Sequence, residues 1–147
     1  MMIIRPLVET DAEALLDLAH KAGVGFTSLP ADPELIQRKI ASSIDSFGAA
    51  EDLTKEQSYV FVLEDTDTDQ VVGICGIESA IGLATPWYTY RIGTLVHSSR
   101  ELGVHNSFPT LYLSNDLTSC AAVCTLFLDP KYRHSKNGSL LSKSRFL

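Results

Sequence analysis

The sequence predicts a mixed α/β (α+β) fold, in which a mostly antiparallel sheet is flanked by helices. Helix-like segments stand near the amino terminus, and β-type runs joined by short turns follow them. Short turns favour antiparallel pairing of successive strands. The chain has 147 residues, of which 45% are hydrophobic and 20% charged, as is usual for a globular protein. We therefore expect residues 1–147 to form one domain.

The first strand and the first helix are marked by short local signals. Residues 2–4 form an apolar strand that ends at Arg5 and Pro6. Thr10 and Glu13 have the spacing of a capping box, which predicts a helix start. Gly23 would close that helix in a left-handed cap. The residues that recur at helical spacing between these ends are Ala12, Leu15, Leu16 and Ala19.

The loop of residues 23–30 is rich in glycine and hydroxyl groups, but it is a weak candidate for phosphate binding because it follows a helix. A second helix is expected to begin near Asp32, with Pro33 at its first position. Residues 48–57 are expected to form a polar loop. The apolar face of the second helix would comprise Leu35, Ile36, Ile40, Ile44 and Phe47.

Residues 58–64 and 71–78 are predicted to form a β-hairpin around the turn at 65–70. Alternating aspartates in that turn invite comparison with a calcium loop. Gln70 stands where such a loop needs glycine, and Gly76 stands where it needs a bidentate glutamate. The turn is therefore interpreted as solvated, and no metal site is expected.

Further strands are expected at residues 87–97, 110–114 and 120–128. Gly93 is a candidate β-bulge, and residues 98–108 are predicted to be a loop with a helical turn. The cysteines are odd in number and form no CxxC pair, which makes a disulfide framework or zinc site improbable. They are expected to be buried thiols in strands: Cys75, Cys120 and Cys124.

Charge and hydropathy exclude several classes of function. The formal net charge of −6 argues against a general nucleic-acid binder. No run approaches the roughly 18 apolar residues of a membrane helix. Residues 1–7 are interrupted by Arg5 and Pro6 and do not resemble a signal peptide. A cytoplasmic protein is the default expectation.

The junction after residues 120–128 is the most informative part of the sequence. Asp129 is the last acidic residue, and a basic loop at 131–139 leads from it into a helix expected from Leu140 onward. Unpaired N–H groups and the dipole at a helix start attract anions. A plain connection with surface lysines remains the alternative. The bases after Asp129 are Lys131, Arg133, Lys136, Lys143 and Arg145.

The order of elements resembles the acyl-CoA N-acyltransferase fold, whose pyrophosphate loop has the form Arg/Gln-x-x-Gly-x-Gly/Ala. The corresponding segment here is RHSKNG at residues 133–138. More specifically, the chain resembles the amino-terminal part of the bacterial arginine N-succinyltransferase family. The segments that carry this resemblance are MMIIRP (1–6), GFTSLP (25–30), YVFVLED (59–65), PWYTYRIGTLVH (86–97), FPTLYLSND (108–116), CTLFLDP (124–130) and NGSLLSKSRF (137–146).

The resemblance implies transfer of a succinyl group from succinyl-CoA to the α-amino group of L-arginine in arginine catabolism, without a metal or a permanently bound cofactor. The family's contact with succinyl-CoA falls on Leu126. An edge strand there would offer its backbone groups to the pantetheine amides while the next helix receives the pyrophosphate. The cofactor-binding residues expected on this basis are Leu126, Leu128, Arg133, Lys136, Asn137 and Gly138.

Two departures from the family pattern matter. Lys136 replaces the first loop glycine, which would strain the backbone if that position requires a positive φ. The family's chain also continues into a second half that supplies a proton-donating histidine and part of the arginine pocket. The sequence is therefore interpreted as a C-terminally truncated fragment with weak or no activity of its own.

Acid–base candidates within the chain are few. Glu78 and Asp116 could face the thioester or the guanidinium group, and Thr27 and Ser28 could belong to an acceptor loop; each is also compatible with an ordinary surface role. Direct transfer is favoured over a covalent enzyme intermediate. The alternative function is a catalytically silent module that binds CoA or a partner subunit. Homo- or hetero-oligomers are expected, with no nucleic-acid or membrane partner.

Overall fold

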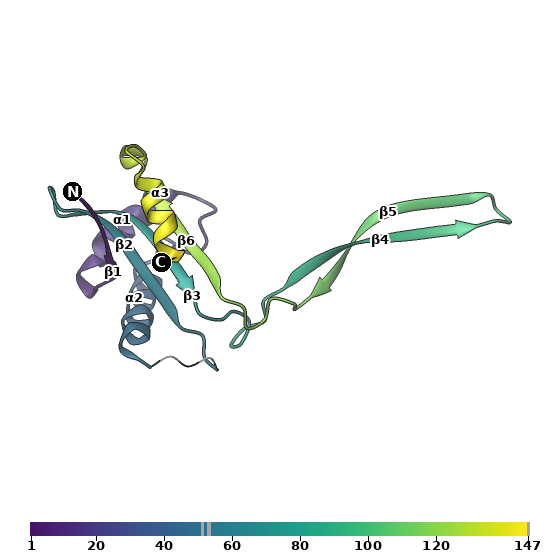
Figure 1. The fold of residues 1–147 in the computed structure, drawn as a ribbon, viewed down its shortest axis with the longest axis horizontal. Coiled ribbons are helices and arrows are strands. Elements are labelled where there is room, and N and C mark those ends of the chain that lie inside the picture. The colour runs from purple at the N-terminus through teal and green to yellow at the C-terminus, as the bar shows by residue number, and fades with distance from the viewer. Residues whose placement is uncertain (51, 53, 147) are drawn as a thin grey trace.

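Four strands form the body sheet in the order β1-β2-β3-β6, and each neighbouring pair is antiparallel (Figure 1). The computed structural model describes residues 1–50, 52 and 54–146. It confirms the predicted mixed fold. The strands are β1 (Met2–Pro6), β2 (Ser58–Asp65), β3 (Gln70–Glu78), β4 (Thr89–Ser99), β5 (Val104–Ser114) and β6 (Ala122–Leu128); the helices are α1 (Ala12–Ala22), α2 (Pro33–Gly48) and α3 (Asn137–Lys143), with 3₁₀ turns at Glu9–Asp11, Pro130–Tyr132 and Ser144–Phe146.

Helices α1 and α2 cover one face of the body sheet, and α3 covers the other. On the first face, Val60 and Ile74 pack in a buried cluster with leucines and isoleucines of both helices. On the second face, Leu141 of α3 is fully buried against Leu63 and Leu128. The strand order leaves β6 at one edge of the sheet, as expected for the strand at 120–128.

Strand β6 contains a bulge where it pairs with β3. Ile74 pairs with Phe127 and Gly76 pairs with Cys124, so Thr125 and Leu126 together face the single residue between them on β3. Thr125 has a φ of +47°, in the left-handed region that β-branched residues rarely adopt. The bulge therefore resets the alternation of side chains along β6.

The second helix begins as predicted, because the Asp32 carboxylate accepts hydrogen bonds from the N–H groups of Glu34 (2.8 Å) and Leu35 (3.1 Å). That helix continues to Gly48, where a loop was expected to begin. Residues 51 and 53 of the expected loop lie outside the described residues.

The predicted capping box of Thr10 and Glu13 is wrong. A 3₁₀ turn, Glu9–Asp11, precedes α1, and the Asp11 carboxylate accepts from the N–H of Val8 at 2.9 Å and pairs with Arg5. Gly23 ends α1 with a φ of +75°, but its ψ of −169° is not that of a left-handed helical cap.

Strands β4 and β5 form a separate two-stranded arm that extends away from the body (Figure 1). Their register is unbroken, so the bulge predicted at Gly93 is wrong; the ring of Tyr112 lies beside this glycine instead. The loop predicted at 98–108 is wrong outside residues 100–103, because residues 98 and 99 belong to β4 and residues 104–108 pair with β4. Because polar residues stand at the start of β5, the sequence did not indicate a strand there.

The start of α3 and the position of Cys120 differ from the predictions. Helix α3 begins at Asn137 rather than Leu140, and the end of the expected range, Leu147, lies outside the described residues. Cys120 is exposed and precedes β6, whereas Cys75 is buried in a strand.

In the described part of the chain, no helix combines the length and apolar character needed to span a bilayer.

Candidate functional site

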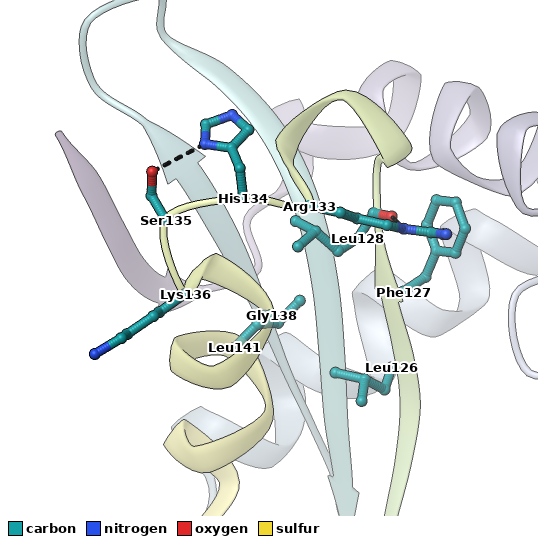
Figure 2. Close-up of a pocket in the computed structure, with 9 residues that line it drawn as sticks. All are labelled: Leu126, Phe127, Leu128, Arg133, His134, Ser135, Lys136, Gly138 and Leu141. Atoms are coloured by element: carbon teal, nitrogen blue, oxygen red, sulfur yellow. Dashed lines mark hydrogen bonds between the residues drawn. The ribbon is translucent and has the colours of Figure 1, made fainter.

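A cavity of about 420 Å³ lies between β6, the basic loop and the start of α3 (Figure 2). We call it the α3 cavity. It brings together all but one of the residues predicted to bind the cofactor, and Phe127, His134, Ser135 and Leu141 complete its wall. The predicted residues that line it are Leu126, Leu128, Arg133, Lys136 and Gly138.

The loop that enters α3 has a strained backbone. Ser135 and Lys136 have φ values of +50° and +63°, and Lys136 is the residue immediately before the helix. The position that the family pattern fills with glycine thus has a positive φ in this chain. A lysine there carries a conformational penalty that glycine would avoid.

Arg133 is fixed at the mouth of the cavity by two contacts. Its guanidinium carbon lies 5.7 Å from the centre of the Phe127 ring, and its Nε donates to the carbonyl of Leu128 at 3.0 Å (Figure 2). Lys136 is exposed and extends from the loop. Within the described ranges, neither side chain forms an ion pair. Both cations can therefore meet an anionic ligand at this mouth.

Asp129 anchors the loop to the body. Its carboxylate accepts from the N–H of Lys131 at 2.9 Å and from the Nζ of Lys21 at 2.7 Å. Burial opposes its ionisation, but these hydrogen bonds outweigh burial and hold the pKa of Asp129 below its ordinary value. The last acid before the basic loop is thus neutralised by α1, which leaves the loop's cations uncompensated.

Asn137 holds the loop closed and does not line the α3 cavity. Its side chain is buried, and its Nδ2 donates to the carbonyl of Tyr132 at 3.0 Å. Its backbone N–H donates to the carbonyl of His134 at 3.0 Å. The N–H of Asn137 is therefore already used within the protein, and anion binding falls mainly to the side chains of Arg133 and Lys136.

A second pocket, of about 290 Å³, lies where β3 ends and β6 begins. We call it the Glu78 pocket. The structure brings the predicted candidates Ser28 and Glu78 together here, whereas Thr27 lines a different cavity beside His20. Most of its other lining residues were not among the candidates predicted from the sequence. The polar and aromatic ones among them are Lys39, Glu56, Thr85, Trp87, Cys124 and Thr125.

The two pockets are lined by consecutive residues at the bulge of β6. Thr125 lines the Glu78 pocket, and the next residue, Leu126, lines the α3 cavity. Successive residues of one edge strand therefore contribute to two different pockets. This arrangement can place two reactants close together across a single strand.

Asp116 lies away from both pockets, at the base of the arm. It forms an ion pair with Arg91, in which the Arg91 Nη2 lies 3.0 Å from Asp116 Oδ1. Hydrogen bonds from Arg91 and then from Ser114 lower the pKa of Asp116. The geometry gives this carboxylate a role in fixing the arm to the turn.

Neither the buried Cys75 nor the half-buried Cys124 is prepared for nucleophilic attack. Burial raises the pKa of both the Cys75 and the Cys124 thiol, which disfavours the reactive thiolate. In the described ranges, no three His, Cys, Asp or Glu side chains gather in a way that could hold a metal ion.

Comparison with protein families finds one match along nearly the whole chain. Residues 2–147 match the family described as "Arginine N-succinyltransferase beta subunit". Arginine N-succinyltransferases of Citrobacter koseri and Escherichia fergusonii are each 55% identical to the chain over its full length. The chain spans 42% of the length of these relatives.

A solved structure shares the fold. It is the arginine/ornithine succinyltransferase subunit AI from Pseudomonas aeruginosa, which is 36% identical and superimposes with a TM-score of 0.89. The match covers 99% of this chain and 44% of that one. The arrangement of the described elements is therefore shared with a solved member of the same enzyme group.

Proposed function

Since the chain belongs to the family of arginine N-succinyltransferase beta subunits, we propose that it contributes to transfer of the succinyl group from succinyl-CoA to the α-amino group of L-arginine. The α3 cavity is the observation that carries this proposal. It lies on an edge strand and has Arg133 and Lys136 at its mouth, and among residues 1–50, 52 and 54–146 no acidic side chain lines it. A long ligand with an anionic end matches these features.

In this proposal the pyrophosphate of CoA lies at the loop and meets Arg133 and Lys136. Charge-assisted hydrogen bonds to phosphate are the strong ones, and no carboxylate among the described residues that line the cavity competes for these cations. The pantetheine arm runs along β6 past Leu128 and Leu126, where the free edge of the strand can pair with its amides. The thioester then arrives near the bulge.

The chemical step requires proton transfers as well as binding. The α-ammonium group must lose a proton before it attacks the thioester, and the departing thiolate must gain one. In the described part of the chain, no histidine lines the Glu78 pocket. More than half of each relative's length has no counterpart in this chain. We propose that the proton donor comes from that remaining part.

Assembly with other chains is also part of the proposal. The family description names a beta subunit, and the Pseudomonas aeruginosa protein is named subunit AI. The uncovered apolar side chains on the arm support association, because large exposed apolar patches usually mark contact surfaces. We propose that the whole protein works as an oligomer.

A coupled measurement tests the function. Calorimetry should detect binding of succinyl-CoA to residues 1–147, and an assay of thiol release should show little or no arginine-dependent turnover by the same sample. Addition of the missing part of a relative should raise turnover. Absence of succinyl-CoA binding would refute the CoA site, and full-rate turnover by residues 1–147 alone would refute an external proton donor.

A further inference from the structure

We infer that the Glu78 pocket is the subsite for the acceptor, and that its residues Glu78, Lys39 and Thr125 determine the preference for the L-arginine of the proposed reaction. This inference rests on the proposed function, because it assigns the second reactant to a second pocket. The pocket is walled by Glu78 of β3, Lys39 of α2 and the loop residues Glu56 and Trp87, and it is closed at β6 by Thr125.

The buried hydroxyl of Thr125 is evidence for a ligand that does not depend on the charged side chains of the pocket. Its side chain is only 4% exposed, yet among the described residues its hydroxyl is the one buried side-chain oxygen or nitrogen without a hydrogen-bond partner. Native proteins leave few buried polar groups without a partner, because the hydrogen bonds that such a group loses with water are then not replaced. A polar group of a bound molecule would supply the missing partner.

The charged side chains of the pocket retain binding capacity. Glu78 Oε1 accepts from the Ser58 hydroxyl at 3.0 Å, and Glu56 Oε1 accepts from the N–H of Leu83 at 2.7 Å. These bonds fix the direction of both carboxylates. Within the described ranges, neither glutamate forms an ion pair, and neither does Lys39.

This donor set matches an amino acid that carries an additional positive charge. Lys39 can attract the α-carboxylate, while two carboxylates and the face of Trp87 suit a guanidinium or ammonium group. A guanidinium binds carboxylates in a fork and stacks on aromatic rings, which favours it over a compact ammonium. An acidic amino acid would be repelled, and a neutral one would leave the glutamates unpaired.

The position of the pocket also suits an acceptor. Because Thr125 and Leu126 are consecutive, a ligand in the Glu78 pocket lies beside the thioester end of a ligand in the α3 cavity. Close placement of two reactants is a large part of catalysis of group transfer. The acceptor would therefore approach the acyl group at the bulge.

The test uses Trp87, the only tryptophan of the chain, as an internal reporter. Its fluorescence is titrated with L-arginine, with L-citrulline, which lacks the guanidinium charge, and with agmatine, which lacks the carboxylate. We expect L-citrulline and agmatine each to bind at least about tenfold more weakly than L-arginine, since each loses one charge-assisted contact. Equal binding of L-arginine and L-citrulline would overturn the inference, as would no response to millimolar L-arginine.

Three variants locate the site. Glu78→Gln should abolish the preference for L-arginine over L-citrulline, and Lys39→Gln should abolish the preference over agmatine. Thr125→Val should weaken L-arginine binding while raising the melting temperature, because it removes an unpaired buried hydroxyl. Glu101→Gln, at the tip of the arm, is the control of matched charge and should change neither preference. Unaltered L-arginine binding in Glu78→Gln and Thr125→Val would refute the location.

Succinyl-CoA is titrated calorimetrically against the same samples. Intact succinyl-CoA binding without an arginine response would refute only the acceptor subsite. An arginine response without succinyl-CoA binding would count against the proposed function and leave the cationic subsite standing.

Discussion

The Nζ of Lys21 on α1 lies 2.7 Å from the Oδ2 of Asp129, immediately after β6. This contact joins the helical layer to the start of the basic loop, across more than one hundred residues of sequence. Lys21 also pairs with Asp17 one helical turn earlier. The position of the loop at the α3 cavity thus depends on an ion pair as well as on apolar packing.

Removal of this pair should lower stability in a pH-dependent way. Lys21→Met is expected to lower the free energy of unfolding by about 1 kcal/mol at pH 7, a modest value because Lys21 is partly exposed. The pKa of Asp129 is lowered in the fold, so its contribution is present above the ordinary carboxyl pKa of about 4 and is lost as the pH falls through the lowered value.

Urea unfolding at pH 7 and near pH 2.5 measures this difference. The variant and the parent should converge in stability at the lower pH. Arg38→Met, which removes a highly exposed pair with Glu34, is the control and should change stability little at either pH. A constant difference between Lys21→Met and the parent would contradict the assignment.

Replacing both Arg133 and Lys136 by alanine should weaken succinyl-CoA binding by at least about tenfold. Added salt should weaken binding by the parent more than binding by the variant, because the lost contacts are electrostatic. Calorimetry at two salt concentrations checks both effects. Arg38→Ala combined with Arg100→Ala removes the same charge elsewhere and should leave affinity nearly unchanged. Equal affinity in a folded double variant at the loop would exclude the loop from the site.

Lys136→Gly should separate the backbone role of this residue from its charge. Glycine adopts a φ of +63° without strain, so we expect the free energy of unfolding to rise by up to about 1 kcal/mol. The same variant should bind succinyl-CoA more weakly, because the ammonium is lost. Thermal unfolding and calorimetry on one sample measure both. A less stable variant would show that the lysine side chain itself stabilises the loop.

The arm should promote self-association as concentration rises. Tyr90, Ile92, Leu111 and Leu113 are each more than half exposed, and their register places them on one face of the arm. Sedimentation velocity should show a dimer that Ile92→Thr with Leu111→Thr weakens, because the apolar face is interrupted. A parent that stays monomeric at several hundred micromolar would contradict this.

Local signals predicted the parts of the fold that depend on neighbouring residues. The Asp32 cap, the hairpin at 65–70 and the basic loop each follow from a few adjacent side chains. The first half of β5 was missed, because its pairing with β4 outweighs the polar character of residues 105–107.

The two pockets of the candidate site also differ in how far the sequence predicts them. The α3 cavity is built largely from residues 126–141 and could be predicted, whereas the Glu78 pocket combines residues from five separate stretches of sequence. A bulge at Thr125 leaves no signature in the sequence, because threonine is not a residue type that indicates a positive φ. Residues such as Lys39 and Glu56 gain meaning only when the fold brings them to one pocket.

The bulge in β6 also bears on how such an enzyme could evolve. Because the extra residue resets the inside and outside positions of the strand, the wall contributed by residues 122–125 is decoupled from the wall contributed by residues 126–128. Mutations on one side can alter the choice of one reactant without changing the side chains that the strand presents to the other. Specificity for donor and acceptor can thus diverge separately while the sheet is preserved.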